Sequence, residues 1–340
     1  MHLKKLLITS TIIAATSISN NTVADIKVSG EQEWNYLDAG GSFKSTLGSS
    51  TSFTFTGTGD LSNGISYLVK FTLEDGDQSY RAITFDLGSG LKLGIGYDQS
   101  YGIETVKAIS PYVNNRRAHI TGAHRGFPTA ARKPLGPDVW DTSSGENAIG
   151  LSFKNDLAAI SFGFTPVRDV NTSTDAIATS SATSSEYGTA SSIGVKLTPV
   201  DGLTIGFGTS SEESDATANS DPKGTTIGFQ YKIGSFAIGY QEIENELDDT
   251  TTQRVTTTEI QEGGVAYKVN DALTIGVFAA NINYLTVNTD NGVETGMGIV
   301  QVGYNLGPAV IQYDYADGSD LNSTKDTEYE IHKVKIKVLF

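Results

Sequence analysis

Residues 333–340, the last eight of the chain, read KVKIKVLF and point to the fold more directly than any other stretch. From 333 to 338 lysine alternates with valine or isoleucine, and Phe340 continues the apolar positions. Successive side chains of a β-strand point to opposite faces, so this segment would present one apolar face and one charged face. The same period of two begins at Ile26 and recurs along the chain, for example in ISYLVKFTLE at 65–74. The sequence therefore predicts an all-β protein.

Sixteen candidate strands follow from this pattern. They start near Ile26, Thr51, Ile65, Ser79, Leu91, Asn147, Leu157, Ala190, Leu203, Thr225, Ser235, Val255, Leu273, Glu294, Pro308 and Glu328. Short turns such as 60–64, 88–90 and 199–202 alternate with mostly long, polar links. Short turns on one side and long loops on the other are the layout of an outer-membrane barrel. We therefore expect residues 25–340 to form a closed, 16-stranded antiparallel transmembrane β-barrel, with both ends on the periplasmic side.

Aromatic residues favour the membrane barrel over the alternative, a soluble β-sandwich or β-solenoid. Tyrosines lie near the strand ends on the apolar face, as aromatic girdles do at membrane interfaces; they are Tyr36, Tyr97, Tyr231, Tyr240, Tyr304 and Tyr315. The other face keeps Thr, Gly, Lys and Gln almost throughout. A packed soluble core would not tolerate so many polar groups.

The first 24 residues resemble a secretory signal. Lys4 and Lys5 precede a short apolar run at 6–15, and Thr22-Val23-Ala24 offers a small-residue cleavage site before Asp25. The apolar run is too short for a spanning helix, which needs about 20 residues. Removal of this segment would leave 22 basic and 39 acidic residues, and 22 minus 39 gives a net charge of −17.

The composition argues against several other classes of protein. A net charge of −15 disfavours nucleic acid as a partner, because phosphate binding needs a basic surface. The chain has no cysteine, so it has no disulfides and no thiolate metal sites. Beyond the signal only His119, His124 and His332 remain, and no catalytic nucleophile or zinc motif accompanies them. We expect no enzyme activity, no cofactor and no metal site.

The longest link, residues 98–146, has an unusual charge. Between Thr105 and Pro137 it contains no acidic residue and eight basic or histidine residues, which are Lys107, Arg116, Arg117, His119, His124, Arg125, Arg132 and Lys133. Loops this long generally have a function. If this one folds into the barrel, its charges would form an anion-attracting constriction, because rings of charge set the ion preference of a pore. Alternatively, individual arginines pair with acidic wall residues and are structural.

The polar face of the strands predicts the wall of the lumen. Its candidate residues are Glu31, Glu33, Lys70, Lys333, Lys335 and Lys337. Barrel closure makes the first and last strands neighbours, so we expect ion pairs between the glutamates and the C-terminal lysines. A second group of lysines lies near the short turns, and a solvated periplasmic rim is its simplest interpretation; the group is Lys92, Lys154, Lys196, Lys232 and Lys268.

With these features the chain resembles the Gram-negative general porin superfamily. The resemblance rests on the signal-like segment, DIKVSG at 25–30, ENAIGLSF at 146–153 and the terminal Phe340. It implies a barrel that assembles as a homotrimer, with the third outer loop folded into the channel as a constriction. It also implies that Phe340 is the assembly signal that the barrel-assembly machinery reads. One departure is the second outer link, a subunit latch in many relatives, which spans only 75–78 here.

These observations support three functions. The first is a water-filled channel for passive diffusion of small hydrophilic solutes and ions, with a preference for anions. The second is a substrate-specific channel of the same fold for phosphate, sulfate or an organic acid. The third is an adhesin or structural barrel whose acidic outer loops bind a partner. Those loops, with Glu212, Glu213 and Asp215 as one cluster, could also hold divalent cations that bridge lipopolysaccharide.

Overall fold

The protein is described by a computed structural model that covers residues 25–39, 45–97, 101–106, 109–110, 112–113, 147–166, 189–213, 223–246, 255–286, 294–319 and 328–340. In these ranges the chain forms sixteen strands and one 3-10 turn, η1 (Gly102–Thr105). The first eight strands are β1 (Asp25–Ala39), β2 (Thr46–Asp60), β3 (Ser66–Glu74), β4 (Asp77–Gly88), β5 (Leu91–Tyr97), β6 (Asn147–Lys154), β7 (Ala158–Thr165) and β8 (Ala190–Leu197). The others are β9 (Leu203–Glu212), β10 (Lys223–Ile233), β11 (Phe236–Glu246), β12 (Val255–Lys268), β13 (Leu273–Thr286), β14 (Glu294–Leu306), β15 (Ala309–Ser319) and β16 (Glu328–Leu339).

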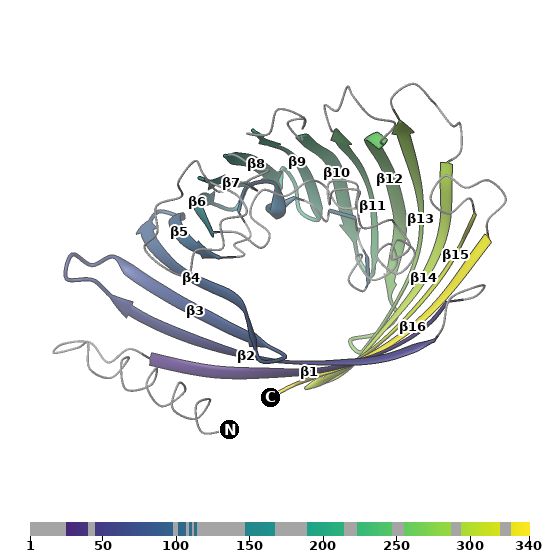
Figure 1. Ribbon diagram of the computed structural model, residues 1–340, viewed down its shortest axis with the longest axis horizontal. Helices are drawn as coiled ribbons and strands as arrows, with labels where there is room; N and C mark the ends of the chain where they lie inside the picture. Colours follow the sequence, from purple (N-terminus) through teal and green to yellow (C-terminus); the bar gives the residue numbers. More distant parts are fainter. Residues whose placement is uncertain are drawn as a thin grey trace, which may run out of the picture.

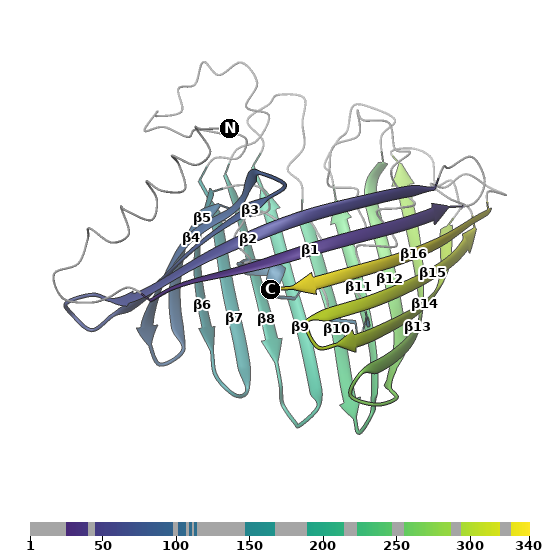
Figure 2. The same cartoon turned by 90° about the horizontal axis from the view of Figure 1, so that it is seen from below.

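The strands form one closed barrel, as the sequence predicts. Each strand pairs antiparallel with its neighbours in sequence, and β1 pairs with β16 to close the ring (Figure 1). Each predicted strand is present within a few residues of its expected start; the largest difference is β2, which begins at Thr46 rather than Thr51. The strands are tilted, and β1 and β2 run obliquely along the near wall of the barrel in Figure 2.

Short connections lie at one end of the barrel. Within the described chain, seven of them each join two successive strands into a hairpin, at 61–65, 89–90, 155–157, 198–202, 234–235, 269–272 and 307–308. Ser89 and Gly90 both have positive φ, as a two-residue hairpin turn requires. At the opposite end, Asp75 and Gly76 form the same kind of turn between β3 and β4. The second outer connection is therefore a tight hairpin, as its length predicts.

Exposure alternates along the strands and separates two faces. On β13, Val277 is 60% exposed, whereas the adjacent Phe278 is 2% exposed because it points into the barrel. The outward positions carry a belt of large apolar side chains, including Ile227, Phe229 and Ile238. No helix among the described residues is long and apolar enough to cross a membrane.

The seam between β1 and β16 is closed by the last residue of the chain. Gly30 and Phe340 exchange two backbone hydrogen bonds, of 2.7 and 3.0 Å. The Phe340 ring lies over Gly30, where an added Cβ would overlap it, and meets the edge of Phe53 with ring centroids 5.9 Å apart. An aromatic ring over a strand glycine covers backbone that a side chain would otherwise shield. Phe340 thus stabilises the closure in addition to any part in assembly.

The Gly30→Val variant should destabilise the barrel by about 1–3 kcal/mol, because the added side chain displaces the Phe340 ring from a packed position. The urea midpoint of unfolding in lipid vesicles, followed by heat-modifiable gel mobility, measures the effect. Gly57→Val is the matched control, since Gly57 is an outward glycine on β2 with nothing within 4 Å of an added Cβ. Equal midpoints for the two variants would contradict a role of Phe340 in closure.

Candidate functional site: the third loop and the inner wall

The described residues of the loop after β5, which are 101–106, 109–110 and 112–113, lie inside the barrel on its inner wall. Tyr101 packs against β5 and β6, where an added Cβ at Gly94 or Gly150 would overlap the tyrosine ring. Further along, an added Cβ at Gly194 would overlap the Gly102 carbonyl, and one at Gly206 would overlap Ile109. These inward glycines form a track without side chains, and the track lets the loop backbone approach the wall closely.

Polar side chains of the wall accept hydrogen bonds from the backbone amides in the first part of the loop. The Gly102 amide donates to Ser161 Oγ on β7 at 2.9 Å, and the Ile103 amide donates to Ser192 Oγ on β8 at 3.4 Å. The loop residues Ile103 and Val106 are fully buried beside them. The helical turn η1 is therefore fixed to the wall at β7 and β8.

Glutamines continue the anchoring further along the same wall, beginning at β10 and β11. Gln241 on β11 accepts from the Ile109 amide at 3.0 Å and donates to the Val106 carbonyl at 3.0 Å, while it is itself fully buried. Gln230 on β10 donates to the Ile109 carbonyl at 3.2 Å. Gln301 on β14 accepts from the Val113 amide at 3.0 Å. The described part of the loop thus follows the inner wall from β5 round to β14.

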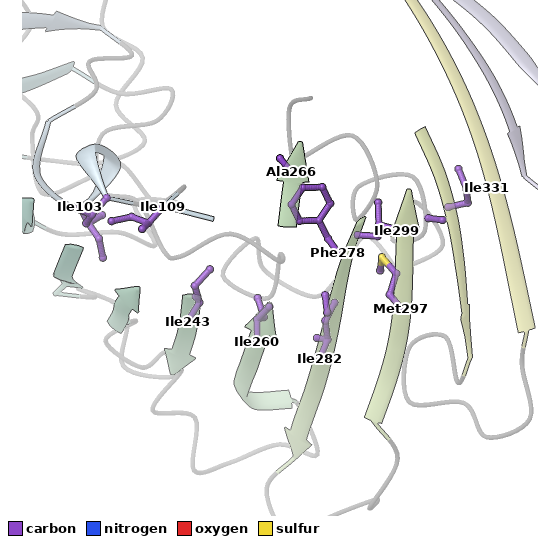
Figure 3. Packing of buried hydrophobic residues seen from close by; sticks show 13 residues of the cluster. Ile103, Ile109, Ile243, Ile260, Ala266, Phe278, Ile282, Met297, Ile299 and Ile331 are labelled. Carbon is purple, nitrogen blue, oxygen red and sulfur yellow. The ribbon is translucent and has the colours of Figure 1, made fainter. Parts of the chain in front are cut away.

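An apolar strip on the inner wall was not predicted. Ile243, Ile260, Phe278, Ile282, Met297, Ile299 and Ile331 lie on β11 to β16 and are buried in one cluster with Ile103, Val106 and Ile109 of the loop (Figure 3). Ile243 is on the same face as Gln241, and Ile299 is on the same face as Gln301, so both point inward. The expectation of a polar inner face almost throughout is wrong for this sector.

Tyr112 joins the loop to this strip. Its ring stacks on Phe278 with centroids 4.4 Å apart, and its hydroxyl donates to Glu262 Oε2 on β12 at 3.1 Å. A sequence signal for the strip was available, because adjacent apolar residues such as Ile299-Val300 break the strict alternation. Two apolar neighbours in a strand place one side chain on each face, so the inner one needs an apolar cover.

The expected ion pairs between the first and last strands are present. Lys337 Nζ lies 2.6 Å from Glu31 Oε2, and Lys335 Nζ lies 2.8 Å from Glu33 Oε2. Glu33 Oε1 also accepts from Asn35 Nδ2 at 2.6 Å. These groups lie on the inner face at the seam, and each glutamate neutralises one lysine.

The remaining lumen-wall candidates have other neighbours. Lys333 stands opposite Asp314 in the β15–β16 register. Lys70 lies over the Tyr80 ring, with its Nζ 4.5 Å from the centroid.

One lysine of the predicted periplasmic rim has a carboxylate partner. Asp271 in a periplasmic turn accepts from Lys268 at 2.8 Å, and this hydrogen bond lowers the pKa of the Asp271 carboxyl.

Two groups of predicted residues remain: the first lies outside the described residues, and the second is placed differently from the prediction. Lys107, Arg116, Arg117, His119, His124, Arg125, Arg132 and Lys133 lie outside the described residues, as does the signal-like segment 1–24. Glu212, expected on an exposed outer loop, is instead the last residue of β9 and is 1% exposed. The strand continues to this residue, and the alternation turns its side chain inward. Glu213 follows it at the surface and accepts from Thr189 at 3.1 Å.

The comparisons with known proteins agree with this architecture. The family model for Gram-negative porins matches residues 9–321. The chain belongs to this porin family. As a member of this family it is a channel of the Gram-negative outer membrane, and it is not an enzyme. No curated protein sequence matches the chain.

Solved structures extend the likeness over the whole barrel. The porin is 13% identical to the trimer form of OmpT of Vibrio cholerae. The match has a TM-score of 0.65 and covers 93% of this chain and 99% of that one. It is 12% identical to the anion-selective porin from Comamonas acidovorans, with a TM-score of 0.63, covering 93% of this chain and 100% of that one. At these identities the matches establish the fold alone.

Gln241→Ala should loosen the third loop, because it leaves the buried Ile109 amide and Val106 carbonyl without their hydrogen-bond partner. Each buried polar group left without a partner costs about 1–3 kcal/mol. Single-channel recordings should therefore show more frequent current fluctuations than the wild type. Gln261→Ala is the control, since Gln261 lies on the outward face of β12 and is exposed. If both variants are equally quiet, the loop does not depend on this anchor.

Proposed function

We propose that this porin lets small hydrophilic solutes and ions diffuse passively across the outer membrane, with a preference for anions. The observation that carries the proposal is the course of the third loop. Its described residues 101–106, 109–110 and 112–113 lie inside the barrel on the inner wall. The same loop carries the acid-free basic run between Thr105 and Pro137. The basic residues of the run therefore belong to a loop that enters the channel.

Electrostatics gives such a loop more influence than its share of the net charge. Charges on exposed outer surface are screened beyond about 10 Å at 0.1 M salt, whereas charges inside a narrow pore act on every ion that passes. Arginine adds a planar fork of donors that matches carboxylate and phosphate oxygens. The seam of the described inner wall is consistent with the same preference, because Glu31 and Glu33 are neutralised by lysines there. An anion-selective relative of the same fold is a further support.

We also infer several properties of assembly. Residues 1–24 are removed as a signal peptide, residues 98–146 form the constriction loop, and Phe340 is read by the barrel-assembly machinery. The porin forms a homotrimer, as OmpT of Vibrio cholerae does in its trimer form. The Asp75-Gly76 hairpin is too short to reach a neighbour, so the trimer is held by other contacts. Lipid and lipopolysaccharide surround the apolar belt.

A potassium chloride gradient across a planar bilayer tests the ion preference. The wild-type reversal potential should indicate chloride preference, and replacing Arg116, Arg117 and Arg125 together with serine should move it toward zero or toward potassium. Replacing Glu213 and Asp215 with serine should change it much less, because exposed charges are screened. A cation-selective wild type would contradict the basic constriction.

Solute dependence separates the general channel from a specific one. A diffusion pore should conduct phosphate, sulfate or an organic acid in proportion to concentration up to high millimolar levels. A current that saturates with one of these solutes would instead support the substrate-specific alternative. A barrel that carries no current in a planar bilayer would support the adhesin or structural protein.

A further inference from the structure

A row of lysines lies on the inner wall just beneath the anchored loop. In the strand register Lys154 on β6 stands opposite Ala159 on β7, and Ala159 stands opposite Lys196 on β8. Neighbouring strands are about 4.8 Å apart, so the two lysine backbones are about 10 Å apart with only an alanine methyl between them. Their stems can therefore converge from both sides of one small space.

The three residues of this row point into the lumen. Ala159 is on the same face as Ser161, which binds the loop amide of Gly102 inside the barrel. Lys154 is on the same face as Gly150, which lies under Tyr101, and Lys196 is on the same face as Gly194, which lies under Gly102. The lysines are two to four residues from these loop contacts, which is about 7–14 Å toward the periplasmic end.

The charge of this pair is not neutralised by the described protein. The inner-wall lysines at the seam have glutamate partners at 2.6 and 2.8 Å, and Lys268 has Asp271 at 2.8 Å. Lys154 and Lys196 make no ion pair with any carboxylate in the described ranges. Asp156, the acidic residue nearest to Lys154 in sequence, lies on the exposed turn.

Further polar groups surround the pair. Lys92 on β5 stands opposite Ser152, one inward position above Lys154, and its ion pair with Asp86 is long at 4.0 Å. Like charges placed side by side on one face of a sheet destabilise it unless something compensates. An anion with two negative charges would compensate both lysines and could accept from the Ser152 hydroxyl as well.

We propose that Lys154 and Lys196, with Lys92 and Ser152 beside them, form an oxyanion subsite at the periplasmic exit of the channel. Its ligand class is a small doubly charged oxyanion such as sulfate or hydrogen phosphate. This proposal rests on the proposed anion preference and adds a ligand class to it. The subsite consists of wall residues and does not include the basic run of the loop. It interprets these lysines as a second anion filter in series with the loop, instead of a solvated rim.

Sulfate is the probe, because its charge stays at −2 near neutral pH. In wild-type channels carrying chloride current, sulfate added on the periplasmic side should reduce the current. The Lys154→Ser/Lys196→Ser variant should need roughly threefold more sulfate for the same reduction. Its chloride-to-potassium permeability ratio should also fall roughly threefold. Both figures correspond to two unit charges acting in water at about 10 Å, one Debye length at 0.1 M salt, on a divalent anion or on the difference between chloride and potassium. Lys223→Ser is the matched control, because Lys223 is exposed on the outward face of β10.

Single cysteines keep the test independent of folding. The chain has no cysteine of its own, so Lys154→Cys and Lys196→Cys each offer one thiol. Attaching an aminoethyl group through a disulfide restores the positive charge and should restore sulfate sensitivity in the same channels. Sulfate sensitivity that matches the wild type in the double variant, or that does not return with the charge, would overturn the subsite. A cation-selective wild type with intact lysine-dependent sulfate block would overturn only the basic constriction.

Discussion

Every backbone amide and carbonyl within a bilayer needs a hydrogen-bond partner, because lipid offers none. This requirement makes the pairing of β1 with β16 the constraint on which the rest of the barrel depends. Without it, two long strands would expose unpaired edges to lipid. The sequence supports the seam on both faces, with Glu31–Lys337 and Glu33–Lys335 inside and the Phe340 ring over Gly30 outside. Backbone closure, charge pairing and aromatic cover therefore coincide at one place.

A closed ring of sixteen strands has room inside, and the third loop uses part of it. The loop can lie against the wall because inward positions on β5, β6, β8 and β9 are glycines, which remove the side chains that would hold the backbone away. Buried serines and glutamines then satisfy the loop backbone, as soluble proteins do for buried chain. The apolar strip on β11 to β16 adds a hydrophobic contact. The wall is thus built for two purposes, to anchor a loop in one sector and to face water in another.

Charge on the inner wall depends on pairing more than on number. The chain carries a net charge of −15, but the seam glutamates are neutralised by lysines, and the lysines of β6 and β8 have no described carboxylate partner. An ion in the lumen responds to the charges that remain uncompensated near its path, since compensated pairs have short-range fields and outer charges are screened. Net charge is therefore a poor guide to the selectivity of this channel.

Local patterns were enough to predict the barrel. A period of two and turn residues such as Ser89-Gly90 depend on neighbours in sequence, and they located sixteen strands and their faces within a few residues. Closure then followed from the even strand number, and with it the ion pairs of Glu31 and Glu33, because only one pair of strands can form the seam. The role of the basic loop residues stays a prediction from sequence.

The tertiary structure decided what depends on register between distant segments. Tyr101 fits over β5 and β6 because Gly94 and Gly150 are brought side by side, although they are 56 positions apart in sequence. Glu212 turned out to point inward because β9 extends one alternation further than the loop composition suggests. The row of Lys154, Ala159 and Lys196 exists only once the hairpins are in register. The alternation of a strand gives the face of a side chain, but its height in the barrel comes from the hydrogen-bonded pairing of every strand around it.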